Sequence, residues 1–286
     1  MSQVDTPAPV DAEPPEPAEQ TDSDAQIEPE EAASGAPAAL ELRAVSKSYG
    51  GTPAVAGIDL VVPAGMYYGL LGPNGAGKTT TLSMISGLLH PDRGDISICG
   101  VNLRKRPREA KRQMGVLPDR LRTFDRLTGR QLLYYTGMLR GMKSAVVAER
   151  TVDLASALDL DAALGRVVSD YSAGMTKKLM LAAAMIHSPK VLVLDEPFEA
   201  VDPASSAKVL EILDSYVAAG GTVLLSSHGM DLIEQVCSRV AVLVAGQILE
   251  EGAVDDVKGD KTLEQRFVEL AGGLGEAEGL EWLHSF

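Results

Sequence analysis

The sequence has two cysteines and no long apolar run, and both shortages limit what kind of protein it can be. Cys99 and Cys237 lie far apart and lack the spacing of metal ligands, which is typical of a chain kept in a reducing cytosol. The densest apolar stretch, Leu179 to Ile186, has eight residues, whereas a membrane-spanning helix needs about 20. We therefore expect a soluble chain that reaches a membrane only through a partner.

The first 38 residues contain no lysine or arginine. They carry ten of the 40 acidic side chains and seven of the 16 prolines, so the other 248 residues account for only −4 of the net charge of −14. A segment this acidic and this poor in apolar side chains cannot offset the entropy lost on ordering, and we predict that residues 1–38 are disordered. They also lack the basic start and apolar segment of a secretory signal. The overall acidity argues against a nucleic-acid partner.

Short apolar segments alternate with helical patterns after residue 38. This alternation predicts an α/β fold with a mainly parallel sheet, in which residues 40–45 and 54–62 form strands of an antiparallel edge region. Asp202, Pro203 and the pair Gly220 and Gly221 predict the start and the end of one helix. Further strands are expected at 66–71, 114–118, 191–194 and 222–226, and a further helix at 79–89.

Strand signals disappear between about residues 127 and 188. Apolar side chains recur there at helical spacing, so we predict a helical subdomain inserted into a domain of residues 39–255. Residues 256–286 are expected to form a helical extension, whose one apolar face docks on the domain. The helical spacing is shown by Leu132, Tyr135, Leu139 and Met142. We expect the methionines of this region to pack in its core rather than to bind a ligand, namely Met138, Met142, Met180 and Met185. The apolar face of the extension consists of Leu263, Phe267 and Leu270.

A glycine-rich run between an apolar strand and a helix has the pattern of a phosphate cradle. Its glycines let successive backbone N–H groups turn toward a phosphate, where a side chain would block the approach. Lys78 can reach the phosphate oxygens and the Thr79 hydroxyl can bind Mg²⁺, with Thr80 next in a helix whose N-terminus faces the anion. The run consists of Gly72, Pro73, Asn74, Gly75, Ala76, Gly77, Lys78 and Thr79.

Two carboxylates follow another apolar strand and complete the predicted nucleotide site. Asp195 and Glu196 come directly after Val191 to Leu194. In P-loop enzymes the first acidic residue holds Mg²⁺, and the second is then placed to polarise an attacking water. Two acidic residues after an apolar strand are common and by themselves give weak evidence for such a site, but together with residues 72–79 they give strong evidence. A second anion site is predicted where a helix begins near Ser172, because its free N–H groups attract negative charge.

Together these segments resemble the nucleotide-binding subunit of an ATP-binding cassette (ABC) transporter over about residues 40–250. The resemblance implies a P-loop NTPase fold of the ABC type, with a mixed sheet core, an antiparallel edge subdomain and an inserted helical subdomain. The matching segments are the Walker A run at 72–79, the signature at 171–175, the Walker B strand at 191–196, the D-loop at Val201 and Asp202, the switch histidine His228, and Tyr49 as the aromatic that stacks on adenine.

The resemblance implies ATP and Mg²⁺ as cofactors and a head-to-tail dimer with a second copy or a homologous ATPase subunit. Each ATP is expected between the cradle of one subunit and the signature of the other. Ser172 and the Gly174 backbone would then bind the γ-phosphate, and Asp202 would signal between the subunits. By the same resemblance, Glu196 would act as the base for attack on this phosphate, and His228 would sense it.

Asp119 stands where members of the family usually carry glutamine, after the strand at 114–118. A carboxylate can still bind Mg²⁺, but its charge adds repulsion beside Asp195 and Glu196. We expect Asp119 to be a coupling residue and treat it as a third candidate metal ligand. The signature also departs from the usual pattern at Tyr171, Ala173 and Met175, while Ser172 and Gly174, which touch phosphate in the family, are kept.

The chain resembles most the stand-alone ATPase subunits of bacterial ABC exporters, in which separate chains supply the membrane helices. It is therefore expected at the cytoplasmic face of the membrane, bound through a permease. One alternative is a soluble ABC protein that acts on DNA or the ribosome, against which the single cassette, the absence of sustained heptads and the acidity weigh. Another is an ATP-binding regulator with little turnover, against which Lys78, Glu196 and His228 weigh.

Residues 104–112 form a basic cluster with two interpretations. A solvated helix face is favoured, since such runs are commonly surface. Contact with anionic lipid headgroups or with an acidic partner is the alternative.

Overall fold

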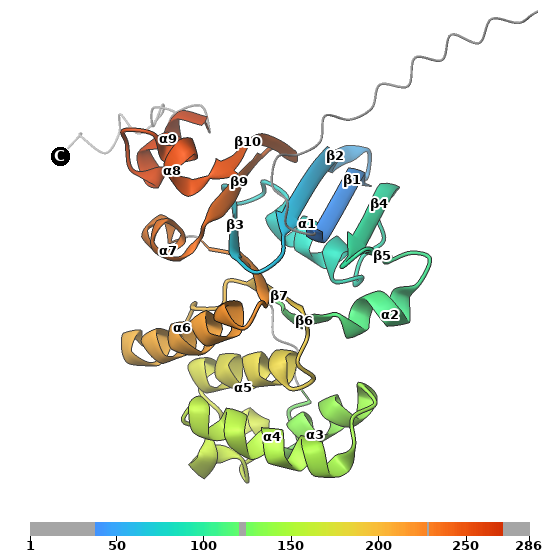
Figure 1. Ribbon diagram of the computed structural model, residues 1–286, viewed down its shortest axis with the longest axis vertical. Helices are drawn as coiled ribbons and strands as arrows, with labels where there is room; N and C mark the ends of the chain where they lie inside the picture. The colour runs from blue at the N-terminus through green and yellow to red at the C-terminus, as the bar shows by residue number, and fades with distance from the viewer. Residues whose placement is uncertain (1–37, 120–123, 228, 271–286) are drawn as a thin grey trace, which may run out of the picture. The chain divides into compact units, whose positions relative to one another are not determined.

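The structure is a computed structural model, and it describes residues 38–119, 124–227 and 229–270 (Figure 1). All of these residues belong to one compact unit. The predicted disordered tail, His228 and the end of the predicted C-terminal extension lie outside the described residues. Ala38, which we assigned to the tail, is instead the first residue of a strand.

The described strands form two sheets. The first is antiparallel, in the order β2-β1-β4-β5, and contains the two predicted edge strands. The second has the order β10-β9-β3-β8-β7-β6 and is parallel except for β10. The bounds are β1 Ala38–Tyr49, β2 Thr52–Pro63, β3 Tyr67–Leu71, β4 Arg93–Ile98, β5 Val101–Asn102, β6 Met114–Leu117, β7 Val191–Asp195, β8 Thr222–Ser226, β9 Arg239–Val244 and β10 Gln247–Ala253.

The central strands β3, β7 and β8 are buried along their whole length, which is why their sequences are apolar runs without alternation. Successive side chains nevertheless point to opposite faces of the sheet. In β7, Leu192 and Leu194 join one core cluster, and Val191 and Val193 join the other. The first cluster contains residues of α5 and α6, and the second contains residues of α1 and of the antiparallel sheet. The sheet thus separates two cores, and the predicted mixed-sheet P-loop architecture is confirmed.

The helices follow the sequence signals at their ends. The helix α6 is capped by the Asp202 carboxylate, which accepts from the Ser205 N–H at 3.0 Å, and it ends before Gly220 as predicted. The helix α1 is shorter than expected and ends at Ile85, because Gly87 takes a left-handed φ of +66° that breaks the helical run. The helices are α1 Lys78–Ile85, α2 Pro107–Arg112, α3 Gly129–Leu139, α4 Ser144–Ala157, α5 Ala173–Met185, α6 Pro203–Ala218, α7 Met230–Val236, α8 Val254–Lys258 and α9 Leu263–Leu270, with 3₁₀ turns at Asp161–Ala163 and Val168–Asp170.

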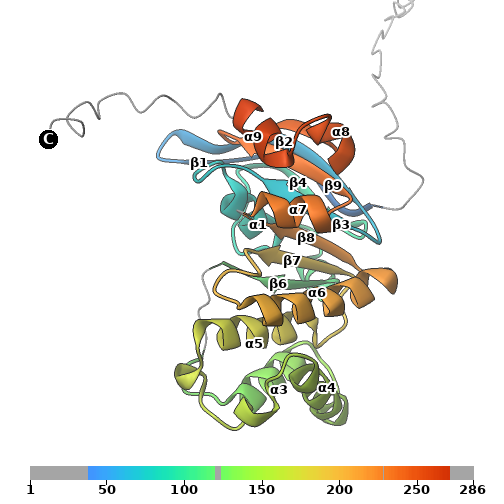
Figure 2. The ribbon, with the colours of Figure 1, turned by 90° about the vertical axis from the view of Figure 1, so that its left-hand side faces the viewer.

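The helices α3, α4 and α5 occupy the region where strand signals disappear, and α5 lies between the sheet and the other two (Figures 1 and 2). The predicted packing of α3 was wrong in part. Tyr135, Met138 and Leu139 are 50%, 40% and 88% exposed. The buried face is instead the one containing Leu132 and Gly137, where a Cβ on the glycine would lie 2.6 Å from Val147 of α4. The helices α3 and α4 therefore approach closely at Gly137, and this contact determines which face of α3 is buried.

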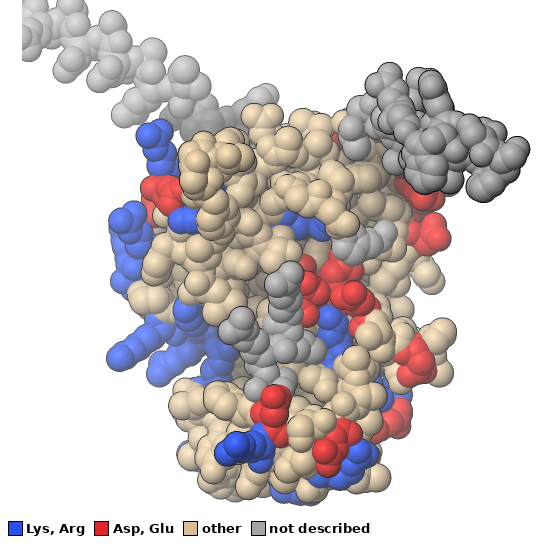
Figure 3. Space-filling view, turned by 180° about the vertical axis from the view of Figure 1, so that it is seen from behind, with Lys and Arg blue, Asp and Glu red and all other residues tan. Residues whose placement is uncertain are grey.

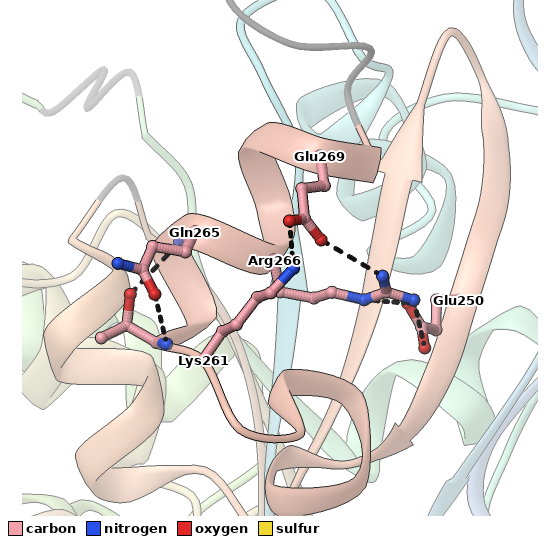
Figure 4. A network of polar contacts seen from close by, with 6 residues as sticks. Glu250, Lys261, Gln265, Arg266 and Glu269 are labelled. Carbon is pink, nitrogen blue, oxygen red and sulfur yellow. Dashed lines mark hydrogen bonds and ion pairs between the residues drawn. The ribbon is translucent and has the colours of Figure 1, made fainter.

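The last described helix, α9, packs on the domain as its apolar spacing predicts. Leu263 belongs to the first core cluster, and Phe267 and Leu270 pack against it. A polar network beside this apolar face pairs Arg266 with Glu250 of β10 at 3.0 Å and with Glu269 at 3.5 Å (Figure 4). Within 38–119, 124–227 and 229–270, no helix has the length and apolarity needed to cross a membrane.

Candidate active site

The glycine-rich run forms a loop between β3 and α1. Gly77 has a φ of +107°, and a Cβ there would lie 2.4 Å from the Ala54 carbonyl oxygen. A Cβ on Gly72 would lie 2.3 Å from the carbonyl oxygen of Leu243. Glycine is therefore required at both positions for steric reasons. Gly77 also precedes α1 without a side-chain cap, which leaves the N–H groups of the first turn oriented toward an anion.

The Lys78 side chain is buried and spans this loop. Its ammonium donates to the Gly72 carbonyl at 2.5 Å and to the Pro73 carbonyl at 3.2 Å. Burial lowers the pKa of Lys78, and the nearby charges of Glu196 and Asp195 oppose that shift. The cation is thus fixed at the mouth of the loop with two carboxylates close by.

The two carboxylates are positioned by the neighbouring strand β8. The register pairs Asp195 with Ser226, and the buried Ser226 hydroxyl donates to Asp195 Oδ1 at 2.5 Å. The same hydroxyl oxygen accepts from the Glu196 backbone N–H at 3.2 Å. Glu196 has a φ of +50°, an unfavourable region for a residue with a Cβ, and such strain concentrates at functional sites. One hydroxyl therefore fixes both acidic residues, and we missed it from sequence because its role depends on strand register.

A cavity of about 300 Å³ brings the cradle and the carboxylates together. Of the predicted residues, Asp119, Asp195 and Glu196 line it together with most of the cradle. Sequence reasoning did not identify Ala54, which belongs to an edge strand, or Glu199, which has no signal beyond its closeness to Glu196. The lining residues are Ala54, Pro73, Asn74, Gly75, Gly77, Lys78, Thr79, Thr80, Asp119, Asp195, Glu196 and Glu199.

Asp119 lines both the cavity beside the cradle and a second, adjoining cavity. It follows β6, and the adjoining cavity, of about 200 Å³, is also lined by Thr79 and Asp195. The position is compatible with both roles that we considered for it, a metal ligand and a coupling residue between the site and a partner.

Ser172, Gly174 and Asp202 are not among the residues that line the nucleotide cavity. Ser172 caps α5, where its hydroxyl accepts from the Met175 N–H at 3.2 Å, while Asp202 caps α6. A Cβ on Gly174 would lie 2.8 Å from the Ala200 carbonyl oxygen, so the starts of the two helices pack against each other. One copy of the chain thus brings the residues of the signature and D-loop segments together, outside the lining of its own cavity.

Two aromatic residues of the predicted site differ in their surroundings. Tyr49 ends β1, is 54% exposed and has the Lys47 ammonium 6.0 Å from its ring centroid. Tyr171 is buried instead, and its hydroxyl donates to the Ala163 carbonyl at 2.7 Å. The unusual tyrosine of the signature therefore fixes the loop before α5 to the helical region, and the exposed ring of Tyr49 is available for stacking.

The donors at the cavity suit magnesium when phosphate oxygens share the ion. The Thr79 hydroxyl and the Asp195 carboxylate are hard oxygen ligands, and Mg²⁺ is usually held by one or two carboxylates together with substrate phosphates. Among the described residues, no group of three or more His, Cys, Asp and Glu side chains could hold a metal ion by itself. The Thr79 hydroxyl and the Asp195 carboxylate thus suit a Mg²⁺ ion whose other ligands include phosphate oxygens.

Comparisons with known proteins agree on one family. The ABC transporter family model matches residues 55–199. The daunorubicin/doxorubicin resistance ATP-binding protein DrrA of Streptomyces peucetius is 39% identical over 220 residues, which cover 77% of this chain and 67% of the relative. The Nod factor export ATP-binding protein I of Burkholderia lata is 40% identical over 220 residues, covering 76% and 71%.

Solved structures with the same architecture include an ATP-binding subunit of an ABC transporter. It superposes with a TM-score of 0.77 at 31% identity and covers 81% of this chain and 98% of its own. A dimeric cassette in a post-hydrolysis state, bound to ADP and Pi, has a TM-score of 0.70 at 20% identity, with 75% and 98% covered. The second likeness concerns the fold alone.

Proposed function

The chain belongs to the ABC transporter family, and we propose that it is the ATP-hydrolysing subunit that powers a separate membrane permease. The observation that carries this proposal is the cavity in which the cradle, Lys78 and two carboxylates converge, with the signature residues elsewhere on the chain. The cavity would be the site for a nucleoside triphosphate, and the signature residues would form the surface that meets the cavity of another copy.

Within one copy, the loop N–H groups and Lys78 would bind the phosphates, and the exposed Tyr49 ring would stack on the base. Thr79 and Asp195 would hold Mg²⁺, which when bound supplies positive charge beside the phosphates. The Glu196 carboxylate accepts a proton from the water that attacks the γ-phosphate, while the Lys78 ammonium stabilises the charge that develops on the phosphate oxygens. Ser226 keeps Asp195 and Glu196 in place during this step.

Two copies, or one copy and a homologous subunit, would meet head to tail. Ser172 and Gly174 then face the γ-phosphate held by the other cradle, and Asp202 lies at the junction of the subunits. Closure excludes water from the site and strengthens the attraction between phosphate and the helix N-terminus, which is worth about 0.3–1 kcal/mol when exposed and about 2 kcal/mol when partly buried. Loss of the bridging phosphate on hydrolysis weakens the closed pair.

We propose export as the direction of transport. The support is that the relatives with about 40% identity are named for drug resistance and for Nod factor export. The chain would then act at the cytoplasmic face of the membrane, where ATP is present and where a permease presents its soluble surface.

The variant Glu196→Gln tests the proposal. It should keep ATP binding, accumulate as a nucleotide-bound dimer, and reduce hydrolysis by roughly 10²–10⁴-fold, because the general base is lost. Turnover is measured by phosphate release and the dimer by light scattering with ATP and Mg²⁺. Unchanged turnover would remove Glu196 from the role of base, and a strictly monomeric variant would contradict the paired site.

A further inference from the structure

A group of basic side chains covers the surface of α2 and of the loop before it. Six of the nine residues from 104 to 112 are basic and one is acidic, in a chain whose net charge is −14. Figure 3 shows Lys and Arg side chains gathered over this part of the molecule, at the left of the view. We call the exposed ones the basic surface, and they are Arg104, Lys105, Arg106, Arg108 and Arg112.

The acidic groups nearby neutralise little of this charge. Glu109 pairs with Arg106 at 3.0 Å, and Asp95 accepts from the Asn102 amide at 2.9 Å. For the other four members of the basic surface, the described part of the chain contains no ion-pair partner. Their positive charge is therefore directed to solvent rather than used in the fold.

The basic surface adjoins apolar surface. A cavity of about 320 Å³ opens between the end of α1, β4 and α2, with Arg104 among its lining residues and Leu89, Ile96 and Leu103 forming apolar wall. The last residue of α3, Leu139, is 88% exposed. Arg140, which follows it, donates to the Lys111 carbonyl of α2 at 2.5 Å, so the end of α3 is joined to the basic helix by the long side chain of Arg140.

We propose that the basic surface binds the headgroups of anionic phospholipids. Free positive charge beside the opening of an apolar cavity is the chemistry that recognises an anionic lipid interface. A net charge of −14 would otherwise repel the chain from an anionic membrane, and the basic surface would turn one face toward it. The proposed function supplies the reason to expect a membrane nearby, but lipid binding is measurable without a permease.

Lipid at this surface would not compete with the nucleotide. The cradle lies at the N-terminal end of α1, and the apolar cavity lies at its C-terminal end, where Met84 and Gly87 line it. Eight helical residues separate the two by about 12 Å, at 1.5 Å per residue. Variants of the basic surface should therefore keep basal ATP binding and hydrolysis.

The test compares two triple variants of the full chain that lose the same charge. One is Arg104→Gln, Arg108→Gln and Arg112→Gln on the basic surface. The matched control is Arg43→Gln, Arg130→Gln and Lys208→Gln, which lie on β1, α3 and α6. Co-flotation is measured with vesicles of phosphatidylcholine alone and with about 30 mol% phosphatidylglycerol, in about 0.15 M salt, where charges more than about 8 Å apart are screened.

The unaltered chain should bind the phosphatidylglycerol vesicles only. Each basic residue at an anionic surface strengthens binding about fivefold, so the basic-surface triple should bind roughly a hundredfold more weakly, and the control triple should change by less than about fivefold. Equal losses in both triples, binding that does not need phosphatidylglycerol, or no vesicle binding by the unaltered chain would overturn the proposal. So would full displacement by inorganic phosphate or by soluble polyglutamate, since a phosphate site or an acidic protein partner would then be the better account.

Discussion

The cradle and the signature region differ in how far their polar side chains are buried. Lys78 of the cradle and Asp195 beside it are buried, and both line the same cavity. Ser172 and Asp202 of the signature region are exposed and cap two helices with their own side chains. The ionic groups at the first region are thus already buried in one copy, whereas the role proposed for the second region requires a partner that excludes water from it.

The largest loss of ATP affinity is expected at the cradle position where an added Cβ is least tolerated. Gly77→Ala places a Cβ 2.4 Å from the Ala54 carbonyl oxygen at a φ of +107°, so the loop must distort. Strain of this kind costs about 1–3 kcal/mol, and we predict ATP binding weaker by about 100-fold in a calorimetric titration. Gly165→Ala is the control, since a Cβ there meets nothing within 4 Å. Equal affinities would mean that the loop does not hold the phosphates.

The second largest effect, a fall in kcat, is expected when the Ser226 hydroxyl that positions Asp195 and Glu196 is removed. Ser226→Ala removes a 2.5 Å hydrogen bond to the Asp195 carboxylate and the acceptor of the Glu196 N–H. A hydrogen bond to a charged group contributes about 1.5–3 kcal/mol, so we expect kcat to fall by at least about tenfold with a smaller change in KM for ATP. Steady-state kinetics and a thermal unfolding curve separate this from global destabilisation. A fall in stability with unchanged kcat would assign Ser226 a purely structural role.

A glycine of the signature region can be changed in the same way as Gly77 of the cradle. Gly174→Ala places a Cβ 2.8 Å from the Ala200 carbonyl oxygen, so the junction between the starts of α5 and α6 must shift. We predict about tenfold slower hydrolysis with ATP affinity of the isolated chain unchanged, because a single cradle binds nucleotide without this junction. A loss of affinity comparable to that of Gly77→Ala would mean that the two regions are not separate in one copy.

The smallest effect is one of pH on stability, at the link between α5 and β7. Burial, and then the charge of Arg140, lower the pKa of His187 to about 4, although its Nε2 lies 3.1 Å from the Met114 carbonyl oxygen. The unfolded chain, with a pKa near 6.5, binds more protons, so stability present above pH 6.5 is lost as the pH falls toward 4. His187→Gln should flatten this part of the curve in urea unfolding at pH 7 and pH 5. An unchanged slope would exclude His187 as its source.

The cradle was predictable from sequence because its geometry is encoded in adjacent residues. Three glycines, a lysine and a threonine between a buried strand and a helix specify one local structure. At the signature region, the predicted helix start near Ser172 indicated only a second anion site, since Ser172 by itself is an ordinary helix cap. Its role opposite the cradle of another copy came only from the family resemblance.

The residues that sequence reasoning missed or misplaced depend on tertiary contacts. Ser226 acts through strand register, and Ala54 reaches the cavity from the edge sheet. Tyr135 and Leu139 have the spacing of a buried face, yet the close approach at Gly137 turns a different face of α3 inward. Periodicity gives the type of element, but it does not say which neighbour will pack against it.

Mixing two inactive variants of the chain tests whether one ATP is shared by two copies. Lys78→Ala disables the cradle and Ser172→Arg disables the signature, so each variant alone should be inactive. In a mixed dimer, one site combines the intact cradle of one chain with the intact signature of the other. Random pairing should then restore roughly a quarter of the unaltered activity per chain, since half the dimers are mixed and each has one working site. A mixture as inactive as its components would contradict the shared site.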